Sequence, residues 1–198
     1  MNEFRKKFTQ EYLADVKRLL DSMEQDLAKE VDKLTTMLIT ARENRNTVFL
    51  MGNGGSASTA SHAAQDLGKC TIADGLPRFR VISLTDSVSS MLAWANDNSY
   101  EEIFIEQLKN LMEPGDIVIG ISGSGNSMNV IKAIEYANKN GGQTVGISGY
   151  NGGKLLEVAQ ENIHVPSSNM QRVEDLHLIV LHLLISILRD EQMEKPRK

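Results

Sequence analysis

The chain has 198 residues, of which 41% are hydrophobic and 24% are charged, and its formal net charge is -5 at pH 7. That length suits one well-buried domain and is too short for two domains of ordinary size. The acidic balance disfavours binding to nucleic acid or to anionic membranes, no apolar run is long enough for a membrane helix, and no apolar signal core follows the N-terminus, so we expect a cytoplasmic protein.

Residues 1–45 are polar, with apolar side chains at the spacing of a helix. This periodicity predicts one long amphipathic helix or two consecutive ones. An apolar stripe that precedes the first strand needs a surface to cover it. The stripe packs on the chain's own domain or at a subunit interface, and residues 46–198 form the α/β core of a single domain spanning 1–198.

Five short apolar runs follow, and helical segments separate them. Because the runs are apolar throughout rather than alternating, they predict parallel strands buried on both faces. They lie at 47–51, 80–84, 116–122, 143–148 and 162–166. Helices are predicted at 56–67, 86–95, 100–112, 127–140, 152–160 and 170–190. This alternation predicts a doubly wound α/β sheet, in which ligands bind at the carboxyl ends of the strands.

Two loops at such strand ends have the composition of a phosphate site. GNGGS at 52–56 leaves the backbone N–H groups accessible at the start of a helix, and ISGSGNS at 121–127 adds three serine hydroxyls at the start of another. Neither loop matches the P-loop or the dinucleotide fingerprint, so we expect no nucleotide cofactor. Either loop alone is explained by a tight strand-to-helix turn, but the pair predicts phosphate binding.

These loops, together with NDN at 96–98 and VEDLHLIVLHLL at 173–184, resemble the SIS (sugar isomerase) family and, within it, the phosphoheptose isomerases. The resemblance covers nearly the whole chain. It implies a five-stranded parallel sheet and a homotetramer with active sites between subunits. It also implies conversion of sedoheptulose 7-phosphate to D-glycero-D-manno-heptose 7-phosphate through an enediol, for lipopolysaccharide or other surface-glycan precursors.

The resemblance also assigns residues that bind the phosphorylated sugar. They are Asn53, Gly54, Gly55, Ser56, Asp97, Ser122, Gly123, Ser124, Ser127 and Glu174. Two of them depart from the family, because Gly123 stands where a threonine is common and Glu174 stands where many members have glutamine. The serines also suit helix N-caps, and Ser127 in particular fits that role.

An aldose–ketose isomerase needs an acid and a base, and the resemblance assigns these catalytic roles to Asp66 and His182. His62 and Asp66 are four residues apart and therefore share one face of the predicted helix. Asp66 replaces the glutamate of the family. His177 lies about 140° around its helix from His182, so we expect it to be a structural or interface histidine.

His62, Asp66, Glu174 and His182 have the ligand types of a site for zinc or another divalent metal, and some phosphoheptose isomerases use these positions for one. About 12 Å of straight helix would separate Glu174 from His182, which is too far for one ion unless the helix begins late or bends. Cys70 is the only cysteine, which excludes a disulfide within the chain and a cysteine-based zinc site. We expect Cys70 to pack as a small apolar group.

Two other functions fit parts of the sequence. One is a non-catalytic SIS protein that recruits a replication initiator, but such relatives tend to lack the carboxylate and the histidine that Asp66 and His182 supply. The other is an isomerase of a different phosphosugar, since nothing in the sequence measures the length of the sugar. A sugar-phosphate sensor is disfavoured because the chain has no room for an attached DNA-binding module.

Overall fold

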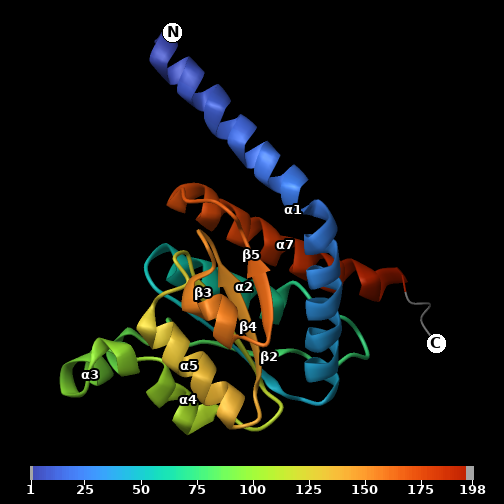
Figure 1. Ribbon diagram of the computed structural model, residues 1–198. Coiled ribbons are helices and arrows are strands. Elements are labelled where there is room, and N and C mark those ends of the chain that lie inside the picture. Colours follow the sequence, from blue (N-terminus) through green and yellow to red (C-terminus); the bar gives the residue numbers. More distant parts are fainter. Residues whose placement is uncertain (1, 195–198) are drawn as a thin grey trace.

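In the computed structural model, which describes residues 2–194, a parallel sheet of five strands forms the centre of the chain (Figure 1). The strand order is β2-β1-β3-β4-β5, and every neighbouring pair is parallel. The strands are β1 (Thr47–Gly52), β2 (Arg80–Ser83), β3 (Ile117–Ser122), β4 (Gln143–Ser148) and β5 (Glu161–His164). This confirms the predicted sheet, with β5 ending before Pro166 because proline cannot donate to a strand ladder.

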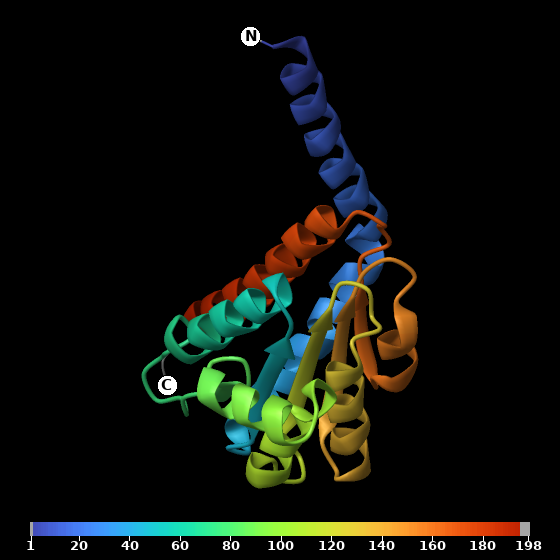
Figure 2. The ribbon, with the colours of Figure 1, turned by 90° about the vertical axis from the view of Figure 1, so that its left-hand side faces the viewer.

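The helices lie on both faces of the sheet (Figures 1 and 2). They are α1 (Glu3–Glu43), α2 (Gly55–Lys69), α3 (Val88–Asp97), α4 (Ile105–Leu111), α5 (Met128–Lys139), α6 (Gly153–Val158) and α7 (Met170–Glu194). The predicted helix at 100–112 is divided, because a 3-10 turn, Tyr100–Glu102, precedes α4. The doubly wound α/β architecture is therefore as the sequence predicts.

Strand β1 shows why its run is apolar throughout. Val48 and Leu50 belong to a core shared with α1, α2 and α7, whereas Phe49 and Met51 belong to a core shared with α4, α5 and α6. Successive side chains of a strand point to opposite faces, so a strand covered on both faces needs apolar residues at every position. All of β1 is buried.

The N-terminal region is one helix, α1, of 41 residues. Asn2 caps it, since its side-chain oxygen accepts hydrogen bonds from the backbone N–H groups of Phe4 and Arg5 at 2.9 and 3.3 Å. Its fully buried positions begin only at Met23, and the first half projects from the body of the molecule (Figures 1 and 2). The chain's own domain thus covers the second half of α1, contacts some of the side chains at 12–20 and leaves residues 3–11 exposed.

The only cysteine of the chain, Cys70, lies at the end of α2. Cys70 is exposed at the end of α2, where its backbone N–H donates to the carbonyl of Asp66 at 2.7 Å, so the expectation that it packs as an apolar group is wrong. The helix ends at this residue, and the chain that follows does not cover it. None of the helices within residues 2–194 is long and apolar enough to cross a bilayer.

Candidate active site

The two predicted loops start side by side on the sheet. Gly52, the last residue of β1, lies opposite Ile121 of β3. β1 and β3 are the two strands from which the chain winds in opposite directions, to β2 on one side and to β4 on the other. Ligands of doubly wound sheets bind at this point, outside the carboxyl ends of the strands.

The first loop is bare because its neighbours leave no room for side chains. A Cβ on Gly52 would lie 2.7 Å from Ser56, and a Cβ on Gly55 would lie 2.5 Å from a carboxylate oxygen of Glu174. Gly54 has a φ of 55°, in the left-handed region that favours glycine. The Glu174 carboxylate therefore lies against the first turn of α2, and Ser56 is buried beneath that turn.

The second loop arranges its hydroxyls around a tight turn. The N–H of Gly125 donates to the carbonyl of Ser122 at 2.9 Å, and the hydroxyl of Ser122 donates to that of Ser127 at 3.0 Å. Ser127 stands at the N-cap position of α5, but its side chain makes no capping hydrogen bond. The Ser124 hydroxyl accepts a hydrogen bond from the N–H of Asn126 at 3.2 Å.

The turn after β4 supports this second loop from behind. The N–H of Gly149 donates to the carbonyl of Gly123 at 2.9 Å, and the N–H of Leu155 donates to that of Gly125 at 2.8 Å. A Cβ on Gly125 would lie only 1.9 Å from the carbonyl oxygen of Gly152. Backbone contacts with the turn after β4 and with the first turn of α6 thus fix the position of the second loop.

An amide pair joins the two loops and was not predicted. Asn53 and Asn129 donate to each other's side-chain oxygens, both at 2.9 Å, and the Tyr100 hydroxyl donates to Asn53 at 2.8 Å. In the sequence, only Asn129 in the SMN stretch at the start of α5 could have indicated this pair, and one asparagine at a helix start is a weak signal. Asp97 is exposed at the end of α3, where it accepts a hydrogen bond from Asn96, and lies outside this network.

Two histidines and an aspartate converge where α2 and α7 lie side by side (Figures 1 and 2). Asp66 Oδ2 is 3.3 Å from His62 Nε2 and 3.8 Å from His182 Nε2, and the two Nε2 atoms are 3.3 Å apart. The side chains of both histidines are close to half exposed, whereas that of Asp66 is 18% exposed. His62 lies at 3.3 Å from both of the other groups, and three such groups within 3.8 Å of one another, reachable by solvent, can exchange protons with a ligand.

The same three groups fit the first coordination sphere of a divalent metal. One ligand atom from each of His62, Asp66 and His182 lies within 4.8 Å of the others. Zn–N bonds of about 2.0–2.1 Å at tetrahedral angles place two nitrogens about 3.3 Å apart, which is the separation of the two histidine nitrogens here. Three protein ligands leave one position for a water or a substrate, as in catalytic zinc sites.

Glu174 is not part of this group. Glu174 lies against Gly55, because its eight-residue separation from His182 along α7 keeps the two side chains apart. His177 is also separate, because it is only 1% exposed and packs in the core. The structure thus brings together three of the four predicted metal ligands.

The family model of the SIS domain matches residues 11–149. The chain is 36% identical to the phosphoheptose isomerase of Aliarcobacter butzleri (strain RM4018) over 89% of this chain and 90% of the relative. It is 37% identical to that of Trichlorobacter lovleyi over 95% and 93%. In fold it is similar to a phosphoheptose isomerase from Francisella tularensis, with a TM-score of 0.87 and 24% identity over 96% of this chain and 100% of that chain.

Proposed function

Because the chain belongs to the SIS-domain family and, within it, to the phosphoheptose isomerases, we propose that it interconverts sedoheptulose 7-phosphate and D-glycero-D-manno-heptose 7-phosphate. The chain is an aldose–ketose isomerase of that family, and its product serves heptose precursors of bacterial surface glycans. The observation that carries the assignment of its chemistry is the convergence of His62, Asp66 and His182 between α2 and α7.

The phosphate end of the substrate binds at the second loop. Ser122, Ser124 and Ser127 offer hydroxyls there, and α5 adds the positive end of its dipole. The first loop is less suited to phosphate, because the Glu174 carboxylate lies against Gly55 and would repel a second anion. Glu174 and the amide of Asn53 instead bind sugar hydroxyls, with Asp97 on the open side of the site.

Isomerisation transfers one proton between C1 and C2 and one between the two oxygens. Asp66 removes a proton from C1 while His182 donates one to the carbonyl oxygen at C2, which forms the enediol. Asp66 then returns its proton to C2, and His182 takes the proton of the C1 hydroxyl. The 3.3 Å contact with His62 orients the carboxylate for both steps.

Zinc or another divalent metal is the proposed cofactor, held by His62, Asp66 and His182. When bound, such an ion would supply Lewis-acid polarisation of the substrate carbonyl, in place of the proton that His182 donates when no metal is bound. We expect protein purified without chelator to carry about one zinc per chain, and His62→Gln to lose it. A content below about one-tenth equivalent with no activation by added zinc would exclude the metal.

The test of the reaction is an NMR time course with sedoheptulose 7-phosphate in D₂O. An aldose product that carries solvent deuterium supports the enediol route. We expect Asp66→Asn and His182→Gln to lower turnover by about 10²–10⁴-fold, whereas Asp74→Asn and His164→Gln, matched changes outside the site, leave it within about twofold. Near-normal turnover in both active-site variants would overturn the catalytic assignment.

The same experiment separates the two alternatives. Turnover of another phosphosugar but not of the heptulose phosphate would move the proposal to that substrate. No turnover or deuterium exchange with any phosphosugar, with or without zinc, would favour a non-catalytic SIS protein that recruits a replication initiator. The close Asp66–histidine contacts count against that outcome, because a recruiting protein has no use for them.

A further inference from the structure

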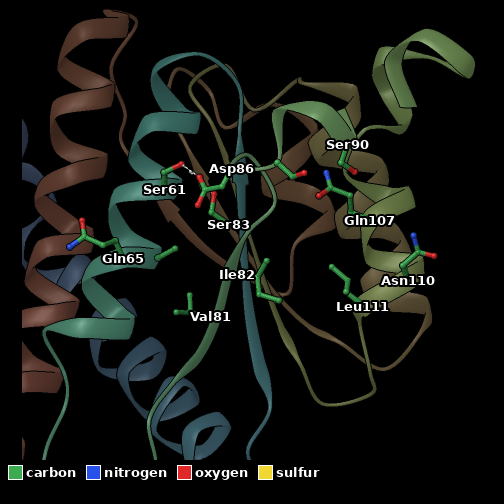
Figure 3. Close-up of a pocket in the computed structure, with 12 residues that line it drawn as sticks. Ser61, Gln65, Val81, Ile82, Ser83, Asp86, Ser90, Gln107, Asn110 and Leu111 are labelled. Atoms are coloured by element: carbon green, nitrogen blue, oxygen red, sulfur yellow. Dashed lines mark hydrogen bonds between the residues drawn. The ribbon is translucent and has the colours of Figure 1, made fainter. Parts of the chain in front are cut away.

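A cavity of about 620 Å³, open to solvent and lined by both polar and apolar residues, lies between α2, β2 and α4. We call it the Asp86 pocket, and it is lined by Ser61, Ala64, Gln65, Val81, Ile82, Ser83, Asp86, Ser87, Ser90, Gln107, Asn110 and Leu111. Figure 3 shows Ser61 and Asp86 on one side and Gln107, Asn110 and Leu111 on the other. Its size falls in the range of small-molecule sites.

A chain of hydroxyls fixes the carboxylate of this pocket. Ser61 donates a hydrogen bond to Asp86 Oδ1 (Figure 3). The Ser61 oxygen also lies 3.0 Å from the Thr85 hydroxyl. Thr85 is in turn 2.6 Å from the hydroxyl of Ser83, and both residues are 7% exposed. No hydrogen bond within residues 2–194 uses Asp86 Oδ2, so this atom is free to accept one from a ligand.

The opposite wall presents a second fixed acceptor. Both amide hydrogens of Gln107 are used, because its Nε2 donates to the carbonyls of Leu84 and Ile103 at 3.1 and 2.7 Å. The side chain is 8% exposed and lines the cavity, which leaves Oε1 as its group for a ligand. Two acceptors held in place on facing walls select a ligand that carries several donors.

The charge of the lining residues restricts the class of ligand further. None of the described lining residues is a lysine or an arginine, and Asp86 is the single charged one. A phosphate would meet this carboxylate without a compensating cation, so an anionic ligand is disfavoured. Serine hydroxyls both donate and accept, and Val81, Ile82 and Leu111 add apolar surface, which suits the C–H face of a sugar ring.

We propose that the Asp86 pocket binds an uncharged monosaccharide or similar polyol, at a site separate from the two loops of the active site. None of its lining residues belongs to 52–56 or 121–127. β2 is an edge strand, so half of its backbone N–H and C=O groups have no strand partner and supply further hydrogen bonds along the pocket. The inference does not depend on which phosphosugar the enzyme isomerises.

Saturation-transfer NMR with D-mannose as the probe tests this on the full chain. We expect transfer to the sugar with a dissociation constant on the order of 1–10 mM, and we expect it to persist when sedoheptulose 7-phosphate saturates the active site. Mannose 6-phosphate should show no binding beyond the active site, because Asp86 repels its phosphate. Loss of the mannose signal on adding the heptulose phosphate would place binding in the active site and overturn the proposal.

Variants assign the signal to the pocket. Asp86→Ala and Asn110→Ala, which change opposite walls, should each weaken mannose binding at least about fivefold, and Asp74→Ala, an exposed aspartate outside the pocket, should not. The side chain of Asn110 makes no hydrogen bond to the residues that the structure describes, so a melting temperature equal to that of the wild type shows that this variant is folded. Absence of transfer at about 50 mM mannose, or unchanged binding in both pocket variants, would overturn the proposal.

Discussion

The Glu174 carboxylate occupies the space beside Gly55 at the start of α2, so a methyl group on residue 55 would displace it. A Cβ on Gly55 would lie 2.5 Å from a Glu174 oxygen, which belongs to the flexible end of its side chain. We expect Gly55→Ala to change the free energy of unfolding by less than about 1 kcal/mol. It should raise KM for the heptulose phosphate several-fold, as steady-state kinetics will measure. An unchanged KM would show that Glu174 does not contact the sugar.

His177 couples stability to pH because it must stay neutral in the core. Its pKa is lowered from 6.5 to about 4, chiefly by burial, while the Ser148 backbone opposes the shift and nearby His164 adds to it. The unfolded chain therefore binds more protons between pH 6.5 and 4, and the folded state loses about 3 kcal/mol of stability across this window as pH falls.

Thermal unfolding between pH 7.5 and 4 measures this loss against His177→Leu, which cannot titrate. The variant should lack the His177 part of the pH dependence, so the melting temperature of the wild type should fall more steeply than that of the variant as pH falls. Parallel curves would show that other groups cause the acid sensitivity.

At the scale of the element, one buried carboxylate holds the start of β3. Asp116 is 3% exposed and accepts hydrogen bonds from the N–H of Thr47 at 2.7 Å and from that of Glu113 at 2.8 Å. Asp116→Ala leaves two backbone donors without a partner, so we expect it to lower the free energy of unfolding by about 2–4 kcal/mol. Urea denaturation should show this loss, and Asp74→Ala should show none.

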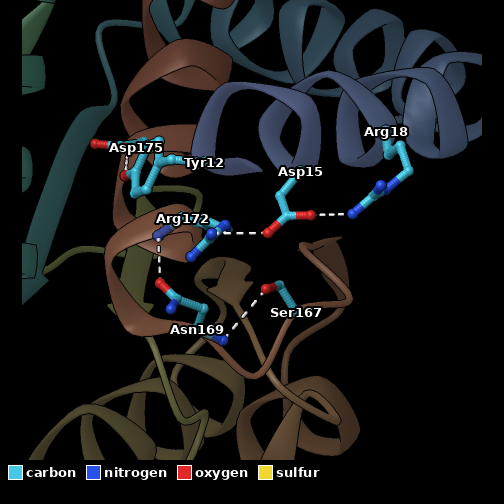
Figure 4. Close-up of polar contacts among 7 residues, drawn as sticks. All are labelled: Tyr12, Asp15, Arg18, Ser167, Asn169, Arg172 and Asp175. Atoms are coloured by element: carbon cyan, nitrogen blue, oxygen red, sulfur yellow. Dashed lines mark hydrogen bonds and ion pairs between the residues drawn. The ribbon is translucent and has the colours of Figure 1, made fainter. Parts of the chain in front are cut away.

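The first turn of α7 is joined to α1 by a compact polar network (Figure 4). The Arg172 guanidinium stacks on the Tyr12 ring at 4.5 Å and pairs with Asp15 at 2.7 Å, while Asp175 accepts a hydrogen bond from the Tyr12 hydroxyl. Arg172→Ala removes both contacts of the guanidinium, and we expect trypsin to cleave within residues 5–20 several-fold faster. Equal cleavage rates would show that the network does not anchor α1.

Strands and helices were predictable from local patterns, but the way they meet was not. The runs around Phe49 and Val118 are apolar at every position, which suffices to predict buried parallel strands. The break before α4 depends on contacts across the fold, because Lys132 of α5 pairs with Glu101 and Glu102 at 2.8 and 2.7 Å. The hydrophobic pattern of a segment does not predict its contacts with residues far away in the sequence. For this reason the Asn53–Asn129 pair and the contact of Glu174 with Gly55 were not predictable either.

At the scale of the whole molecule, the exposed residues 3–11 of α1 predict that copies of the chain associate with one another. Phe4 and Phe8 are 73% and 54% exposed, and their ring centroids are 6.0 Å apart on one face of the helix. Exposed apolar surface of this kind is typical of interfaces, and the family resemblance implies a homotetramer. We therefore expect light scattering to find an oligomer that the Phe4→Glu/Phe8→Glu variant converts to smaller species with a folded core.

A matched variant tests where the interface lies. Val88 and Leu92 of α3 are also exposed, at 59% and 63%, and are one turn apart. Val88→Glu/Leu92→Glu makes the same chemical change away from α1 and should leave the oligomer intact. Dissociation by this variant alone would move the interface to α3.

The turn after β4 limits how the chain can change in length. Surface turns commonly accept insertions, and the connection between α2 and β2 has that freedom at 72–78, between the buried Thr71 and Phe79. The turn at 149–153 does not, because Gly149 donates to Gly123 of the second loop and Gly152 leaves no space beside Gly125. One inserted residue there would shift the serines of the second loop, so we expect the chain to accept added length between α2 and β2 but not in the turn at 149–153.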